Sequence, residues 1–391
     1  MTSAESQYFA LLRAALWDTP VAIDGAIDWQ RVMSLAQFHA NSVLVSDVAL
    51  RLPNEQQPDA DLRLQMQYTM RTNLFRQLNL KQILLSAVKL LREHDIEPVL
   101  LKGFSLALLY PNPSLRQFGD IDLFVGLDRF HEACALMRTL PGGYNWGGEV
   151  DAGHHYNIEF GEYPMEIHRV STDVDDPAEY AIYSQIEHDG LVEHRQQVDF
   201  DGFEVTIPSK EFMVFFTFFH AWHHFLTTGV GWRQISDMAM TLHAYYGQLD
   251  TDKLRRWLAD MHLMQPWQTF GWLMVNCLGL PEAEMPFYDA ACRRRAQRLY
   301  RRIMEEGNFK RKSSCKEHKL RKVGIERKFY SFVLIFVDFF RIAKVFPGIA
   351  FRRMKVMFHL SLKKNSKKID FFVHEWINCV FLQRQMCENK H

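Results

Sequence analysis

The clearest chemistry in this sequence lies in the segment GDIDLFV, residues 119–125, where Asp120 and Asp122 stand two residues apart. The apolar residues around them favour a strand. Because side chains alternate between the two faces of a strand, both carboxylates should point the same way. Two like charges held together repel and are costly to desolvate, and a bound cation offsets that cost. The pattern therefore predicts a Mg²⁺ site, since Mg²⁺ takes one or two protein carboxylates together with substrate phosphates.

A third carboxylate follows later in the chain. Glu166 lies in PMEIH, residues 164–168, where an acid stands between apolar residues as in a short strand. If this strand lies beside the strand of Asp120 and Asp122, three carboxylates converge, as two-metal phosphoryl transfer requires. Taken alone, a D-x-D pair is often a solvated strand edge, and Glu166 alone is more often a surface residue.

A glycine-containing turn precedes the aspartates. Residues 96–101 read as a short strand, and the residues Lys102-Gly103-Phe104-Ser105 then open a helix. Such a turn can present backbone N–H groups and a hydroxyl to a phosphate. The alternative is that Gly103 only allows the chain to turn.

The order of these elements resembles the DNA polymerase β-type nucleotidyltransferase superfamily. The segment LLKGFSLALLYPNPSLRQFGDIDLFV, residues 100–125, is similar to an uncharacterised bacterial nucleotidyltransferase family with an L-K-G…L-Y-P…R…D-I-D core. The resemblance continues through MEIH, IPSKEFMVFFTFFHAWHHF and GWRQISDMAM, and covers about residues 5–245.

The resemblance implies roles for particular residues. Asp120, Asp122 and Glu166 would be the catalytic metal ligands. Six further residues would contact the nucleotide: Lys102, Gly103, Ser105 and Arg116 at the phosphates, and Arg233 and Asp237 on a helix that faces it. The implied cofactor is Mg²⁺, with Mn²⁺ as the alternative, and the implied substrate is an NTP such as ATP. The acceptor stays open among a small molecule, a glycan precursor, a protein and RNA.

The predicted fold class is α+β, with a small mixed β-sheet nucleotidyltransferase core and helical N-terminal and C-terminal regions. Helical periodicity indicates the helices, and Asp201-Gly202 predicts a hairpin between two strands. Four parts are expected: a helical N-terminal region (1–95), the catalytic core (96–207), a helical domain completing the nucleotide site (208–306) and a basic helical tail (307–391).

The net charge of zero hides an asymmetry. Residues 293–391 hold 26 Lys and Arg against 8 Asp and Glu, whereas residues 1–292 hold 20 against 38. The basic residues near 329–368 alternate with large apolar ones, which suits peripheral contact with an anionic membrane. The alternatives are a helical domain with solvated charges, which we favour, and nonspecific nucleic-acid binding.

Cysteine usage and hydropathy indicate the compartment. The six cysteines form no C-x-x-C pair, which fits a reducing cytoplasm better than a disulfide framework. The longest apolar run, near residues 329–340, is interrupted by Asp338 and is shorter than the roughly 20 residues that span a bilayer. We expect a cytoplasmic protein that is soluble or peripheral at the inner membrane face.

Histidines offer a further hypothesis. His220, His223 and His224 share one helical face and could bind zinc, but a core or nucleotide-stacking role is favoured because no acidic residue lies nearby in sequence. His154-His155 is predicted to be a strand pair with one residue exposed. Two functions of other classes also stay open: a non-catalytic nucleotide-binding or regulatory protein, and a membrane- or partner-docking protein that acts through its basic tail.

Overall fold

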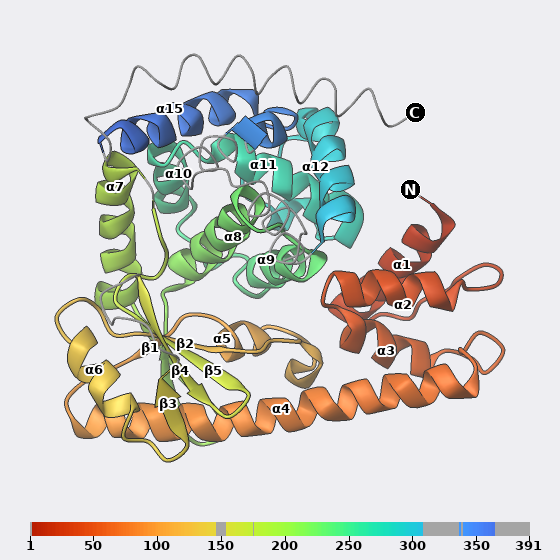
Figure 1. Ribbon diagram of the computed structural model, residues 1–391. Helices are drawn as coiled ribbons and strands as arrows, with labels where there is room; N and C mark the ends of the chain where they lie inside the picture. The colour runs from red at the N-terminus through yellow and green to blue at the C-terminus, as the bar shows by residue number, and fades with distance from the viewer. Residues whose placement is uncertain (1, 146–153, 175, 308–335, 338, 364–391) are drawn as a thin grey trace, which may run out of the picture. The chain divides into compact units, whose positions relative to one another are not determined.

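The structure, a computed structural model, describes residues 2–145, 154–174, 176–307, 336–337 and 339–363 of the 391-residue chain (Figure 1). The chain divides into two units, Met1–Ser314 and Cys315–His391. The first unit holds the sheet, and the second contains helix α15 (Pro347–Lys363). Most of the predicted basic helical tail (307–391) lies outside the described residues.

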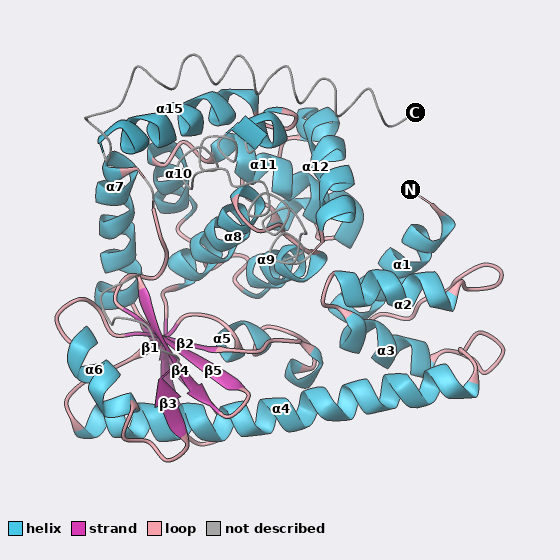
Figure 2. Ribbon diagram, viewed as in Figure 1, coloured by secondary structure: helices cyan, strands magenta, loops and turns pink. Residues whose placement is uncertain are grey.

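The described residues form a seven-stranded mixed sheet in the order β3-β4-β5-β2-β1-β7-β6. Figure 2 shows strands of this sheet in magenta and the helices in cyan. Its strands are β1 (Val99–Leu100), β2 (Ile121–Phe124), β3 (Gly143–Asn145), β4 (His155–Phe160), β5 (Tyr163–His168), β6 (Gln196–Asp199) and β7 (Glu204–Ile207). The pairs β2–β5 and β1–β7 are parallel, and the others are antiparallel. Together with the flanking helices, this mixed sheet confirms the predicted α+β class.

Local sequence explains several of these strands. All four residues of β2 are buried, as expected for a central strand with neighbours on both sides. The hairpin between β6 and β7 turns at Asp201 and Gly202, whose φ values are 56° and 83°. Positive φ at both positions is what a two-residue hairpin loop requires, so the Asp-Gly prediction is confirmed.

Four helices precede the sheet: α1 (Ser3–Trp17), α2 (Trp29–Phe38), α3 (Ser42–Arg51) and α4 (Ala60–Glu93). Helix α4 extends for 34 residues because no Gly or Pro interrupts it, and the Asp59 side chain caps its first turn. It reaches from the loop before β2, where Arg76 donates to the Gly119 carbonyl at 2.9 Å, to β7, where Arg92 donates to the Glu204 carbonyl at 2.8 Å. The helix therefore fixes the segment that leads into the aspartate strand.

The helices after β1 complete the first unit. They are α5 (Phe104–Ala107), α6 (Phe130–Met137), α7 (Pro177–His188), α8 (Lys210–Leu226), α9 (Trp232–Ala244), α10 (Thr251–Asp260), α11 (Met264–Leu273) and α12 (Arg293–Glu306). Helix α8 begins after a Ser209 cap and buries most of its aromatic side chains, so it forms much of the core. Among the described residues, no helix combines the length and apolar character that would let it span a bilayer.

Candidate active site

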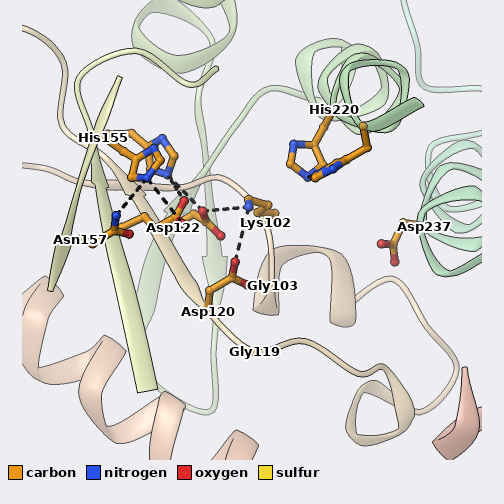
Figure 3. Close-up of polar contacts among 12 residues, drawn as sticks. Lys102, Gly103, Gly119, Asp120, Asp122, His155, Asn157, His220 and Asp237 are labelled. Atoms are coloured by element: carbon orange, nitrogen blue, oxygen red, sulfur yellow. Dashed lines mark hydrogen bonds and ion pairs between the residues drawn. The ribbon is translucent and has the colours of Figure 1, made fainter. Parts of the chain in front are cut away.

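The carboxylates of Asp120, Asp122 and Glu166 all lie near the amine of Lys102, where β2 and β5 lie side by side. The parallel register of these strands pairs Asp122 with Glu166. Asp120 stands just before β2, and its carboxylate and that of Asp122 approach the same amine, the Nζ of Lys102, at 3.7 and 3.0 Å (Figure 3). The strand of Glu166 thus lies beside the D-x-D strand, which was the condition for the three acids to meet.

His168 joins the carboxylates from the end of β5. Its Nε2 lies 3.1 Å from Asp122 Oδ1 and 3.3 Å from Glu166 Oε2. Burial lowers the pKa of His168, but hydrogen bonds to the two carboxylates outweigh it and raise the pKa to about 9. Sequence reasoning did not select His168, although strand alternation places it on the same face as Glu166.

Lys102 supplies the second positive charge at the acids. Burial lowers its pKa, yet the fields of Asp122, Asp120 and Glu166 together raise it well above the usual value for lysine. Burial by itself would raise the pKa of Glu166. The hydrogen bond from His168 and the charge of Lys102 outweigh burial and hold this pKa well below the usual range. The site therefore holds the charged carboxylate of Glu166 near a charged amine.

Two of the three carboxylates, those of Asp122 and Glu166, belong with His168 to a group of possible metal ligands. Asp122 Oδ2 is buried and has no hydrogen-bond partner among the residues that the structure describes. Ligand atoms of Asp122, Glu166 and His168 lie within 4.8 Å of one another. A buried carboxylate oxygen without a donor is costly, and a hard cation with oxygen preference would satisfy it.

The turn of Lys102 and Gly103 approaches the strand of the acids closely. Gly103 has φ 74° and ψ −108°, and a Cβ on it would lie 3.3 Å from the Asp120 carbonyl oxygen. This backbone conformation and close approach explain why glycine occupies the position. Ser105 is buried in α5, and its hydroxyl lacks a hydrogen-bond partner within the described part of the chain.

Arg116 and Asp237 form an ion pair next to this turn. Arg116 Nε and Nη2 donate to the two carboxylate oxygens of Asp237 at 2.6 and 2.9 Å, and Arg116 Nη1 donates to the Gly103 carbonyl at 2.9 Å. Burial lowers the pKa of Arg116, but Asp237 raises it further than burial lowers it. The pair thus joins α9 to the glycine turn.

Arg233 lies one turn earlier on α9. Its Nη1 donates to the Gln117 carbonyl at 3.0 Å, and its Nε is buried without a partner among the described residues. Burial and the neighbouring charge of Arg116 lower its pKa. Arg233 therefore brings a positive charge to the same region as Asp120.

A cavity of about 320 Å³ connects these groups. That volume is at the lower end of the range for small-molecule sites. Seven of the nine predicted site residues line it: Lys102, Gly103, Arg116, Asp120, Glu166, Arg233 and Asp237. The other two, Asp122 and Ser105, are buried and are not part of the lining.

Helix α8 forms another wall of the cavity, with His220, His223 and His224 in the lining. The Nε2 atoms of His220 and His224 lie 3.0 Å apart, and His224 Nδ1 lies 2.8 Å from the Thr228 hydroxyl. Burial is the main cause that lowers the pKa of His220 well below its ordinary value, and the neighbouring His224 lowers it further. His220 is therefore a neutral wall residue on the far side of Lys102 from the aspartates (Figure 3).

The prediction for His154-His155 is wrong, because neither residue is exposed: their side chains are 22% and 23% accessible. His154 Nδ1 lies 2.8 Å from Asp173 Oδ2, and His155 Nδ1 lies 2.9 Å from His154 Nε2. The antiparallel register of β4 and β5 sets His155 opposite His168. Both residues therefore lie at the edge of the acid site. Side-chain alternation in β4 and β5 could have predicted this position only if the order of the strands had been known.

Comparison with known proteins gave one match. The sequence model of a family described as uncharacterised nucleotidyltransferase matches residues 25–279, which is more than half of the chain. No match was found among curated proteins or among solved structures.

Proposed function

Since the chain belongs to this family of uncharacterised nucleotidyltransferases, we propose that it transfers a nucleoside monophosphate from an NTP to a hydroxyl acceptor. In this reaction the acceptor oxygen bonds to the α-phosphorus, the bond from that phosphorus to the β-phosphate bridge oxygen breaks, and pyrophosphate leaves. The proton of the acceptor hydroxyl is released to water. The observation that carries the proposal is the pairing of Asp122 with Glu166 across parallel strands, with Asp120 directed to the same amine.

In this proposal Asp120, Asp122 and Glu166 hold divalent cations, Mg²⁺ or alternatively Mn²⁺. Such ions supply charge neutralisation at the phosphates and lower the pKa of an attacking hydroxyl. The buried, unpartnered Oδ2 of Asp122 supports the assignment within the described residues, because carboxylate oxygens are the donors that these cations prefer.

The remaining predicted residues are proposed to have three roles. Lys102 and Arg233 carry positive charge at the cavity wall, where phosphates would lie. Gly103 allows the chain close to the acid strand, and Ser105 offers a buried hydroxyl beneath the turn. Arg116 and Asp237, which were predicted as nucleotide contacts, are proposed instead to hold the turn in place, because their charges are directed at each other.

The test is a transfer assay with four labelled NTPs and cell extract, comparing the wild type with Asp122→Asn. The variant keeps the side-chain volume but removes a charged ligand, so transfer should fall at least about a hundredfold. EDTA should stop transfer by the wild type, and added Mg²⁺ should restore it. Glu159→Gln, on the neighbouring strand β4, is the matched control and should transfer normally. Normal turnover by Asp122→Asn with circular dichroism unchanged would refute the metal role.

A second candidate is a non-catalytic nucleotide-binding protein. It is favoured by the ion pairs of Lys102 and His168, which already neutralise much of the charge of the carboxylates. Calorimetry with each NTP and Mg²⁺ separates the two functions. Tight nucleotide binding without pyrophosphate release in any extract would support the binding protein and contradict the enzyme.

A further inference from the structure

Three imidazole rings gather beside the carboxylates, at the start of β4 and the end of β5. Each of His154, His155 and His168 offers a ring nitrogen within 4.8 Å of the other two. Their ring centroids are separated by 4.3 to 5.6 Å. The register of the β4–β5 hairpin sets His155 opposite His168, and His154 precedes His155 directly. The strand register therefore brings the three rings close together.

Asp173 orients the outermost ring. Its Oδ2 accepts from His154 Nδ1 at 2.8 Å, which leaves His154 Nε2 directed at His155 Nδ1, 2.9 Å away. A carboxylate on one ring nitrogen is the usual outer partner of a metal-binding histidine, because it fixes the tautomer and the ring orientation. Asp173 therefore has the place of a residue that positions a ligand.

From this arrangement we propose that His154, His155 and His168 form a binding site for one divalent transition metal of the zinc class, distinct in chemistry from the carboxylate site. Imidazole nitrogens suit Zn²⁺ and similar ions, whereas Mg²⁺ prefers oxygen donors. Ligands at about 2.1 Å from a tetrahedral Zn²⁺ lie roughly 3.4 Å apart, and the three ring nitrogens lie within 4.8 Å of one another.

Neighbouring charges support a cation at this position. Glu166 Oε1 lies 3.7 Å from His155 Nε2, and Glu166 Oε2 lies 3.3 Å from His168 Nε2. These carboxylate oxygens would compensate the positive charge of the metal ion, as carboxylates at the edge of such sites do.

The site would be open on one side. His154 and His168 line the 320 Å³ cavity, together with Ser171 and Thr172. Three protein ligands and a fourth position open to a cavity are typical of catalytic zinc sites, and closed four-ligand sites are typical of structural ones. The open position would receive the acceptor hydroxyl, and this last step rests on the proposed transfer reaction.

The test uses Co²⁺ as a spectroscopic probe and Zn²⁺ calorimetry on the full-length protein after metal removal. The expected result is one equivalent of Co²⁺ with d–d absorption in the visible, retained in a hundredfold excess of Mg²⁺. Asp173→Asn should bind Co²⁺ about 10- to 100-fold more weakly without loss of a direct ligand. The double variant His154→Gln with His155→Gln should lose the absorption. Because Asp173 is largely exposed, its variant provides the test even if the double variant does not fold.

The matched control is the double variant His220→Gln with His224→Gln, on the opposite wall of the cavity. It removes two facing imidazoles and should bind Co²⁺ as the wild type does. The proposal is overturned if the wild type gives no visible absorption, if Asp173→Asn binds with unchanged affinity, or if only the His220–His224 control loses the signal.

One more variant separates this proposal from the proposed function. Asp120→Asn alters the carboxylate site, where the Asp120 carboxylate pairs with Lys102. It should abolish nucleotidyl transfer and leave the Co²⁺ spectrum unchanged. A wild type that transfers nucleotide but binds no Co²⁺ contradicts the histidine site alone. A wild type that binds Co²⁺ but transfers nothing supports the metal site and contradicts the enzyme.

Discussion

Arg116 and Asp237 form a buried ion pair that joins two distant parts of the chain. Two parallel hydrogen bonds of 2.6 and 2.9 Å connect them, and each residue is only 4% exposed. Tyr110 also donates to Asp237, at 2.8 Å, while Arg116 reaches the Gly103 carbonyl. The pair therefore couples helix α9 to the glycine turn that lies against the acid strand.

Breaking this pair should destabilise the protein strongly. Asp237→Ala leaves a buried guanidinium without its partner, and we expect the free energy of unfolding to fall by about 3–5 kcal/mol in urea titrations. The double variant Arg116→Met with Asp237→Leu removes both charges and should recover at least half of that loss. Arg51→Ala, which breaks the partly exposed pairs of Arg51 with Asp47 and Asp18, is the control and should cost less than about 1 kcal/mol. A loss for Asp237→Ala no larger than that of the control would contradict the coupling.

Gly103→Ala should impair transfer beyond its effect on stability. The added Cβ would meet the Asp120 carbonyl oxygen at 3.3 Å and the Phe118 ring at 3.4 Å, in addition to strain from the positive φ. Gly25→Ala is the matched control, because Gly25 has φ 77° with no atom within 4 Å of its added Cβ. Both variants should lose about 1–3 kcal/mol of stability. Only Gly103→Ala should lose transfer activity, and equal activity of the two variants would speak against a role of the turn in placing Asp120.

Lys102→Met should separate cation binding from catalysis. The Lys102 amine competes with a cation for Asp120 and Asp122, so its removal should strengthen Mn²⁺ binding without nucleotide by about tenfold, or roughly 1.4 kcal/mol. Transfer should nevertheless decrease at least about tenfold if Lys102 contacts the phosphates. Electron paramagnetic resonance of Mn²⁺ and the transfer assay measure the two effects. Weaker Mn²⁺ binding by the variant would show that Lys102 is not a competitor of the cation.

His39 should make folding sensitive to acid. The ring is fully buried, neither nitrogen hydrogen-bonds to any residue that the structure describes, and burial lowers its pKa to about 3. The unfolded chain, with a histidine pKa of about 6.5, binds more protons than the folded protein between these values. Stability therefore decreases as the pH falls through that window, by about 1.4 kcal/mol per pH unit, and is unaffected by His39 above it.

The variant His39→Leu tests whether His39 causes the acid sensitivity. Leucine fills the space next to Phe38 and Tyr8 but cannot titrate. Urea unfolding at pH 8 and at pH 5 measures the difference. The wild type should lose about 2 kcal/mol more than the variant between these two conditions. Parallel losses in both proteins would assign the acid sensitivity to other groups.

Patterns among residues close in sequence were sufficient to predict much of the fold. The Asp201-Gly202 hairpin and the strands that carry Asp122 and Glu166 follow from turn chemistry and alternation, which involve residues close in sequence. Strand β3 (Gly143–Asn145) was not predicted, because the proline and glycines at residues 141–143 indicated only a chain break. Its pairing with β4 is a long-range contact that no local pattern reports.

The sequence by itself predicted that the carboxylates of Asp120 and Asp122 point the same way, because side chains alternate along every extended segment, although Asp120 lies just before strand β2. It also carried the family match over residues 25–279. Only the tertiary structure decided that His168 bridges Asp122 and Glu166, that Asp173 orients His154, and that Arg116 pairs with Asp237. Those contacts depend on strand order and helix packing, which arise from the sum of many long-range interactions and leave no periodic signal in the chain.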